Sequence, residues 1–148
     1  MSDSLGFLIS DVSRLLRRRF DERARAIGVT RAQWRTLVTL SRNEGVNQGG
    51  LADLLEVEPI TLCRMVDRLA EAGLVERRRD PADRRAWRIF LTDAARPLLE
   101  QLRDLADDLL QQALAGISDA RQAALIETLN DLRGNLSSPL PTRETAHG

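Results

Sequence analysis

The sequence predicts a mainly α-helical fold with a single small β-hairpin. Apolar residues recur at helical spacing through most of the chain, and residues typical of helix starts and ends separate these segments. Strict apolar–polar alternation occurs on the two sides of one turn-prone segment, DPADRRA at residues 80–86. We therefore expect several helices and a hairpin within residues 75–91.

Composition narrows the classes of function. The 148 residues have the length of one domain, and 43% hydrophobic with 30% charged residues indicates a chain that buries a core and stays in solution. All 22 basic residues are arginine, tyrosine is absent, and the one histidine is His147. Lysine nucleophiles, histidine acid–base catalysis and multi-histidine metal sites are therefore not expected. We predict no enzymatic activity, no cofactor and no metal.

The single cysteine, Cys63, has no partner for an internal disulfide, which fits a reducing compartment. No apolar run approaches the ~18 residues needed to cross a bilayer. The first ten residues lack the basic start of a signal peptide. We expect a cytoplasmic protein with no membrane partner. Cys63 is interpreted mainly as a core residue, and its redox activity is left open.

The first two helices have clear boundaries. Apolar spacing predicts a helix over residues 5–27, which Gly28 ends by taking a left-handed conformation. Thr30 and Gln33 are spaced as a capping box at the start of a second helix, which ends near Asn43. Its expected inward residues are Trp34, Leu37, Val38 and Leu40.

Two further helices follow closely. Asn47 is a suitable N-cap for a short helix over residues 48–55, and a three-residue turn leads to Pro59, which favours the first position of a helix. This fourth helix, residues 59–72, is closed by Gly73. Its expected buried residues are Leu62, Leu69 and either Met65 or Val66.

After the hairpin, Thr92 is expected to cap a long helix over about 93–115, with Pro97 in its second turn as a source of bending. Gly116 ends this helix, and Ser118 caps a last one that runs to about residue 136. Residues 137–148 are predicted to be a disordered tail.

The order short helix, turn, longer helix and hairpin is that of a winged helix-turn-helix. In such a unit the second helix, here 59–72, lies in the major groove of double-stranded DNA. Its outward residues near the N-terminus are Ile60, Thr61, Arg64 and Arg68. Arginine can grip a guanine edge or hold a phosphate.

Charge is divided along the chain. Residues 59–91 contain eight arginines and five acids, whereas residues 100–134 contain three arginines and seven acids. The helices at both ends of the chain carry many apolar residues. A winged-helix unit alone is too small to cover all of this apolar surface. A second copy of the chain can cover them, so we expect a homodimer with two recognition helices about one duplex turn apart.

Three segments carry a family resemblance. GVTRAQWRTL, LADLLEVEPITLCRMVDRLAEAGLVERR and DPADRRAWRIFLTDAARPLL resemble the MarR family of bacterial transcriptional regulators, most closely its SlyA-like branch. The resemblance covers about residues 8–136. Its most specific part is Asp-Arg-Arg-Ala at 83–86, followed by Arg88-Ile89 and Leu91-Thr92.

The resemblance implies a DNA-binding lobe over residues 30–92 and a helical dimerisation region over 5–28 and 93–136. Thr61 and Arg64 match recognition-helix positions that contact DNA, and Arg68 is expected to contact it as well. Arg84 matches the wing arginine that enters the minor groove, where the negative potential is enhanced. Asp83 matches the acid that holds this arginine in place. We also expect Arg85, the next residue of the wing, to contact DNA.

The resemblance also implies regulation by a small phenolic or aromatic acid. The family's ligand cleft lies between the DNA-binding lobe and the dimer helices. The expected ligand-binding residues are Arg14, Arg17, Arg18, Trp34 and Leu37. An arginine and an indole suit an aromatic carboxylate. A solvent-exposed role for the arginines and a core role for Trp34 remain open.

The predicted function is sequence-specific DNA binding by a homodimeric transcriptional regulator, as a repressor, on a pseudo-palindromic operator. Two alternatives stay open: a helical adaptor that binds a protein partner instead of DNA, and a ligand-independent regulator that displaces another DNA-bound protein. For Arg64 and Arg68, the alternative to DNA contact is an ion pair with Asp67 or Glu71.

Overall fold

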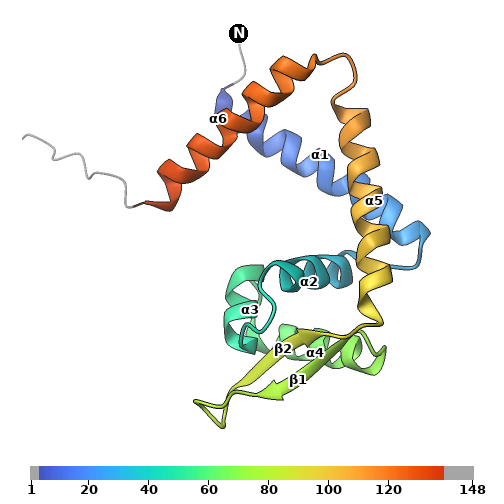
Figure 1. Cartoon of the computed structure of the whole chain (residues 1–148), viewed down its shortest axis with the longest axis vertical. Coiled ribbons are helices and arrows are strands. Elements are labelled where there is room, and N and C mark those ends of the chain that lie inside the picture. Colours follow the sequence, from blue (N-terminus) through green and yellow to red (C-terminus); the bar gives the residue numbers. More distant parts are fainter. Residues whose placement is uncertain (1–3, 139–148) are drawn as a thin grey trace, which may run out of the picture. The chain divides into compact units, whose positions relative to one another are not determined.

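The structure is a computed structural model that describes residues 4–138. Within these residues it contains six helices and one two-stranded antiparallel hairpin, in the order α1–α4, β1, β2, α5, α6 (Figure 1). The mainly helical fold with a small hairpin wing is thereby confirmed. The chain divides into two units, one up to Leu109 and one from Leu110 onward, and each is described by itself.

The predicted helix ends are present in the first unit. α1 (Leu5–Ala26) is followed by Gly28 with a φ of +82°. α2 (Arg31–Arg42) starts at a complete capping box: the backbone N–H of Gln33 donates to Oγ1 of Thr30, and the backbone N–H of Thr30 donates to Oε1 of Gln33. These bonds satisfy backbone groups that the helix leaves free.

α3 (Gln48–Leu55) and α4 (Pro59–Glu71) form the helix-turn-helix. Asn47 caps α3 by accepting from the N–H of Gly50 at 2.7 Å. The turn begins at Glu56, which adopts a left-handed conformation with a φ of +54°. Glu58 makes no side-chain cap, and Pro59 opens α4 instead. Leu62, Val66 and Leu69 are buried, so Val66 rather than Met65 takes the central core position.

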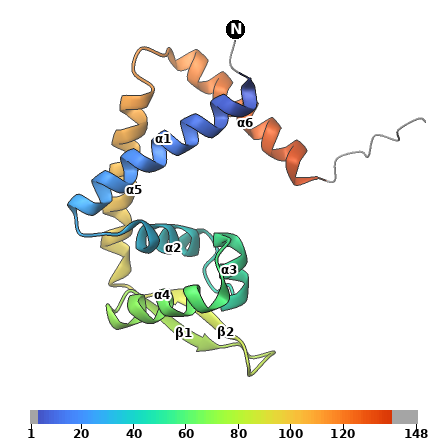
Figure 2. The same ribbon diagram turned by 180° about the vertical axis from the view of Figure 1, so that it is seen from behind.

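The hairpin consists of β1 (Val75–Arg79) and β2 (Trp87–Leu91), paired from Val75↔Leu91 to Arg79↔Trp87. Helix α4 covers one face of the hairpin, as opposite views show (Figures 1 and 2). On its other edge β2 bonds to the segment before α3: the N–H of Gly45 donates to the carbonyl of Ile89, and the N–H of Ile89 donates to the carbonyl of Val46. The wing is therefore tied directly to the start of the helix-turn-helix.

Two hydrophobic clusters hold the first unit together. One joins α2, α3, α4, the hairpin and the start of α5, with Leu37, Leu40, Leu51 and Ile89 completely buried. The other joins α1 to α5 (Ala95–Ala113) through Phe20, Ala24, Val29, Leu102 and Leu109. Burial of such side chains is the main favourable contribution to folding.

The start of α5 differs from the prediction. The Thr92 hydroxyl donates to the carbonyl of Gly73 at 2.5 Å, so it joins the end of β2 to the end of α4 and does not cap α5. The helix begins at Ala95, two residues later than expected, which places Pro97 in the first turn. A helix leaves its first N–H groups unpaired, so a proline there removes no helical hydrogen bond and the predicted bend has no cause.

The second unit contains the end of α5 and α6 (Asp119–Ser137). Gly116 has a φ of +79° between the two helices, and Ser118 caps α6 by accepting from the N–H of Arg121. The predicted tail, residues 137–148, lies outside the described residues from 139 onward. Among the described residues, no helix has the length and hydropathy to cross a membrane.

Candidate nucleic-acid interface

The N-terminal half of α4 presents the predicted recognition residues. Ile60, Thr61, Arg64 and Arg68 are all exposed, with Ile60 at 64%. They are exposed because Leu62, Val66 and Leu69 turn the opposite face of the helix into the core. A helix with one buried and one exposed face has the geometry that a major groove accepts.

Neither of the two arginines predicted to contact DNA from α4 is paired with a neighbouring side chain. Within residues 4–138, the guanidinium groups of Arg64 and Arg68 take part in no ion pair or hydrogen bond. Asp67, which was a candidate partner for both, instead pairs with Arg77 at 2.6 Å. The surface ion pair weighed as the alternative for these arginines is therefore absent from the described residues.

Arg77 is a structural residue that sequence reasoning did not assign. Its guanidinium donates to the Gln48 side chain on α3 at 3.1 Å and to the Cys63 carbonyl on α4 at 3.2 Å. Together with Asp67, these contacts connect β1 to both helices of the helix-turn-helix. The sequence signal available was alternation alone, which puts Arg77 opposite the buried Ile89 on the inward side of the hairpin.

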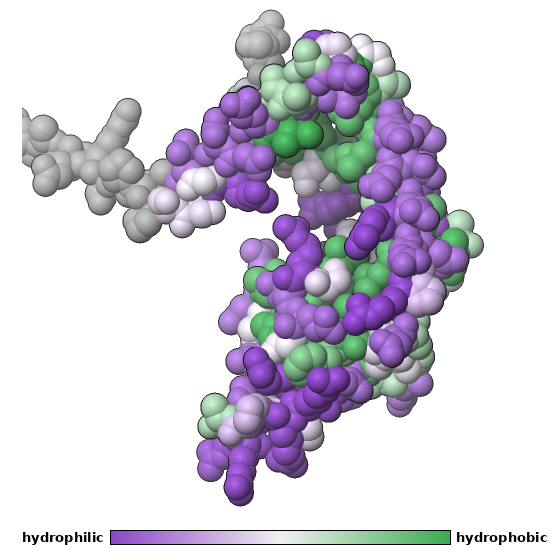
Figure 3. All heavy atoms as spheres, in the orientation of Figure 1, coloured by the Kyte–Doolittle hydropathy of each residue, from purple (hydrophilic) through white to green (hydrophobic). Residues whose placement is uncertain are grey.

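The wing loop, residues 80–86, carries further cations. The side chains of Arg84 and Arg85 are exposed and have no ion-pair partner within the described chain. Asp83 accepts from the backbone N–H of Arg85 at 3.0 Å, so its carboxylate holds the loop backbone and not a guanidinium. Hydrophilic residues dominate this end of the lobe in the space-filling view (purple, lower left of Figure 3).

The predicted ligand residues occupy three different environments. Arg14, Arg17 and Arg18 are exposed on α1, where Arg14 lies 3.6 Å from Asp11. Trp34 is half-buried: its indole packs edge-on against Phe20, and its N–H donates to Asp21 at 2.6 Å. Leu37 is completely buried in the lobe core, so a ligand would reach it only if the core opened. These residues do not line a common pocket that the structure shows.

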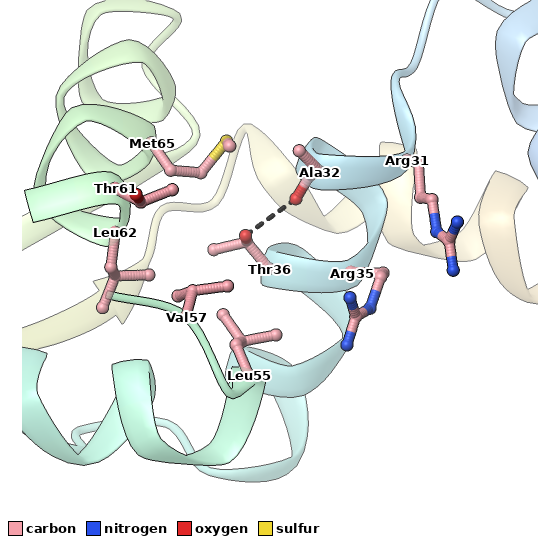
Figure 4. A pocket seen from close by; sticks show the side chains of 9 residues that line it. All are labelled: Arg31, Ala32, Arg35, Thr36, Leu55, Val57, Thr61, Leu62 and Met65. Atoms are coloured by element: carbon pink, nitrogen blue, oxygen red, sulfur yellow. Dashed lines mark hydrogen bonds between the residues drawn. The ribbon is translucent and has the colours of Figure 1, made fainter. Parts of the chain in front are cut away.

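A pocket of about 490 Å³ lies instead between α2 and the helix-turn-helix (Figure 4). Leu55, Val57, Leu62 and Met65 supply its apolar surface, with the Thr36 side chain donating to the carbonyl of Ala32. The remaining lining residues are Arg31, Arg35 and Thr61. The pocket therefore combines apolar groups with two arginines and borders a predicted DNA contact.

Comparison with known proteins places the lobe in a family. The model of the MarR family matches residues 29–87, which extend from two residues before α2 to the first residue of β2. The solved structure described as the multiple antibiotic resistance repressor MarR is 28% identical, with a TM-score of 0.82 over 89% of this chain and 96% of that one.

Two mutant MarR structures from E. coli are also similar. One is 28% identical, with a TM-score of 0.81 over 90% of this chain and 98% of that one. The other, which is complexed with operator DNA, is 29% identical, with a TM-score of 0.69 over 86% of this chain and 92% of that one. The matched family model shows that residues 29–87 form a MarR-family domain, and the six helices and paired hairpin of the described residues share the winged-helix fold of the MarR structures.

Proposed function

We propose that the protein is a sequence-specific transcriptional repressor that binds a pseudo-palindromic operator as a homodimer. The observation that carries the proposal is the set of unpaired arginines on one lobe. Arg64 and Arg68 on α4, with Arg84 and Arg85 on the wing, are exposed and form no ion pair within residues 4–138. A similar chain in the same family has been solved with operator DNA.

The physical basis is the chemistry of the guanidinium group. It forms bidentate hydrogen bonds to guanine edges in the major groove and is attracted to the narrow minor groove of A-tracts. An arginine already paired with a carboxylate would have to lose that partner before binding. Asp67 forms its ion pair with Arg77. Arg64 and Arg68 therefore have no ion pair with Asp67 to break before they bind DNA.

Exposed apolar side chains support the homodimer. On α1, Leu5, Leu8, Ile9, Val12 and Leu15 are each at least 43% exposed. On α6, Leu125, Ile126 and Leu129 are each at least 44% exposed, and no residue of this helix is buried. Apolar stripes of this kind mark interaction surfaces, and a second copy placed there would set two recognition helices on successive half-sites.

Release by a small aromatic or phenolic acid is the regulatory part of the proposal. The pocket beside α4 offers apolar contacts and the guanidinium of Arg35, which suit an aromatic carboxylate, whereas the Arg31 guanidinium lies 3.6 Å from Asp21. The site expected from the resemblance, at Arg14, Arg17, Arg18, Trp34 and Leu37, is the competing location. A ligand that binds the free protein more tightly than the DNA-bound form weakens operator binding by linkage.

The first test is fluorescence anisotropy of labelled duplexes over a salt series, including DNA upstream of the protein's own gene. Arg64→Ala is expected to weaken specific binding by about 5- to 150-fold, corresponding to about 1–3 kcal/mol for a base-reading arginine. Arg103→Ala, which removes an exposed arginine from α5, is the matched control for net charge and should bind like the wild type.

Two results would reject the proposal. Micromolar binding that is equal on all duplexes is only the non-specific level, and it would favour the protein-adaptor function. Equal losses in Arg64→Ala and Arg103→Ala would show that binding depends on net charge and not on the recognition helix.

The ligand site has its own test. Benzoate and salicylate are titrated into the operator complex of the wild type, of Arg35→Ala and of Arg17→Ala. Loss of the response in Arg35→Ala alone supports the pocket beside α4, whereas loss in Arg17→Ala alone supports the site on α1. A wild-type complex unaffected by a broad panel of aromatic acids would favour a ligand-independent regulator that displaces another DNA-bound protein.

A further inference from the structure

The last pair of the hairpin ladder, Arg79 and Trp87, holds the wing loop. The two residues face each other at the loop end of the ladder, and the Arg79 guanidinium lies over the Trp87 ring at 4.8 Å from its centroid. A cation over an indole face is attracted by the ring's quadrupole. Arg79 is thus fixed at the base of the loop.

From this position Arg79 reaches into the loop. Its Nη1 donates to the backbone carbonyl of Arg84 at 3.0 Å. The contact spans five residues and is made to the main chain of the residue whose side chain is predicted to enter the minor groove. A guanidinium that lies over a tryptophan ring is therefore hydrogen-bonded to the Arg84 backbone.

The remaining loop contacts are local. The N–H of Ala82 donates to the Asp80 carboxylate, and the N–H of Arg85 donates to the Asp83 carboxylate. The N–H of Ala86 donates to the carbonyl of Asp83, and the N–H of Asp80 donates to the carbonyl of Ala86, which closes the loop at its base. Within the described part of the chain, the side chain that lies outside the loop and donates a hydrogen bond to the tip of the loop is that of Arg79.

We propose that Trp87 and Arg79 are positioning residues that order the wing loop and thereby present the Arg84 guanidinium to DNA. The proposal rests on the proposed DNA-binding function. Without the stack, the loop has to be ordered when DNA binds, and ordering a long side chain costs affinity. Asp83, the brace expected from sequence, then acts on the loop backbone, and the stack of Arg79 on Trp87 supplies the connection to the hairpin.

The decisive variant is Trp87→Ala, because it changes no charge. We expect operator affinity to fall about 2- to 12-fold, the range for ordering one long side chain on binding. In an Arg84→Ala background, Trp87→Ala should lower operator affinity by less than about twofold, because the Arg84 guanidinium that Trp87 helps to position is absent. Trp87→Phe keeps an aromatic face for Arg79 and should restore most of the affinity. The salt slope of Trp87→Ala should move toward that of Arg84→Ala.

Amide hydrogen exchange without DNA provides a second, independent measurement. Trp87→Ala and Arg79→Met should raise exchange in residues 80–86 and leave α3 unchanged. Arg78→Met is the matched control: it removes a guanidinium from the same strand, but that group pairs with Glu76 and lies over Phe90, with no bond to the loop. Melting curves of each variant establish that the lobe remains folded.

The proposal is overturned if Trp87→Ala binds like the wild type, if its loss is equal in the Arg84→Ala background, or if loop exchange is unchanged. Failure of the DNA-binding function itself would appear differently: the wild type would show no specific binding, while loop exchange would still report on the role of Trp87 and Arg79.

Discussion

The carboxylate of Asp67 lies 2.6 Å from the guanidinium of Arg77, which connects the recognition helix α4 to the wing strand β1. Arg77 is only 22% exposed and also donates to Gln48 on α3. One side chain therefore joins three elements of the winged-helix lobe. The same pair keeps Asp67 away from Arg64 and Arg68, which are left available for a polyanion.

Arg77→Ala is expected to lower the free energy of unfolding by about 1–2 kcal/mol. Hydrogen bonds to charged groups contribute about 1.5–3 kcal/mol, reduced here because Asp67 is 53% exposed. Urea denaturation measures the change. Arg78→Ala is the matched variant on the same strand, and its exposed pair with Glu76 should contribute no more than about 0.5 kcal/mol. Equal effects of the two substitutions would contradict the connecting role of Arg77.

Leu51 and Leu54 compare a buried and an exposed leucine in one short helix. Leu51 is 0% exposed and Leu54 is 51% exposed. Leu51→Ala should destabilise the lobe by about 2–5 kcal/mol through the cavity it leaves, whereas Leu54→Ala should stay within about 0.5–1 kcal/mol. Thermal and urea unfolding of both variants give the difference. Similar losses would place Leu54 in a contact that the described chain does not contain, such as a partner surface.

Replacing each of the two glycines of α3 with alanine should change the stability of the protein differently. A Cβ on Gly49 would meet only the Asn47 side chain at 3.6 Å, an ordinary contact, so Gly49→Ala should stabilise the protein by about 0.4–1 kcal/mol. A Cβ on Gly50 would lie 2.9 Å from Val46 and 3.2 Å from the Asn47 cap. Gly50→Ala should therefore give no gain or a loss. Stabilisation of equal size in both variants would show that Val46 and Asn47 move without cost.

The exposed face of α1 should be needed for assembly. Leu8→Glu with Val12→Glu places two charges on a stripe whose residues are 45% and 55% exposed. If a second copy covers this stripe, the variant should be a folded monomer with weak operator binding, because one recognition helix loses the benefit of the other. Sedimentation velocity measures the mass, and Ser10→Glu, on the opposite side of α1, is the control. A wild type that sediments as a monomer would reject the homodimer.

Local features of the fold follow from short-range rules. The capping box at Thr30 and Gln33, the left-handed glycines at 28, 73 and 116, and the Asn47 cap each depend on residues within one turn. The hairpin register follows from alternation around a seven-residue loop. Such features depend on backbone conformation and nearest neighbours, so periodicity and cap residues were sufficient to predict them.

The contacts that shape the candidate interface join residues distant in sequence. Arg77 donates a hydrogen bond to Gln48, which is 29 residues away in the sequence, and Thr92 donates one to Gly73, which is 19 residues away. The Trp34 indole N–H donates to Asp21 on another helix. Helical periodicity predicted only that Trp34 faces inward and could not identify this partner. No local pattern indicates which of several arginines has a carboxylate beside it once the elements pack.

The sequence by itself determined the order of helices and strands, their caps, and the arginines of the recognition helix and wing, because each depends on intrinsic preferences and on the spacing of polar and apolar residues. Tertiary structure alone decided which arginines are engaged. Arg77 and Arg79 are held by partners, while Arg64, Arg68, Arg84 and Arg85 form no ion pair within residues 4–138. The physical reason is that pairing depends on distances of a few ångström between side chains, and these distances exist only after the core has fixed the elements against one another.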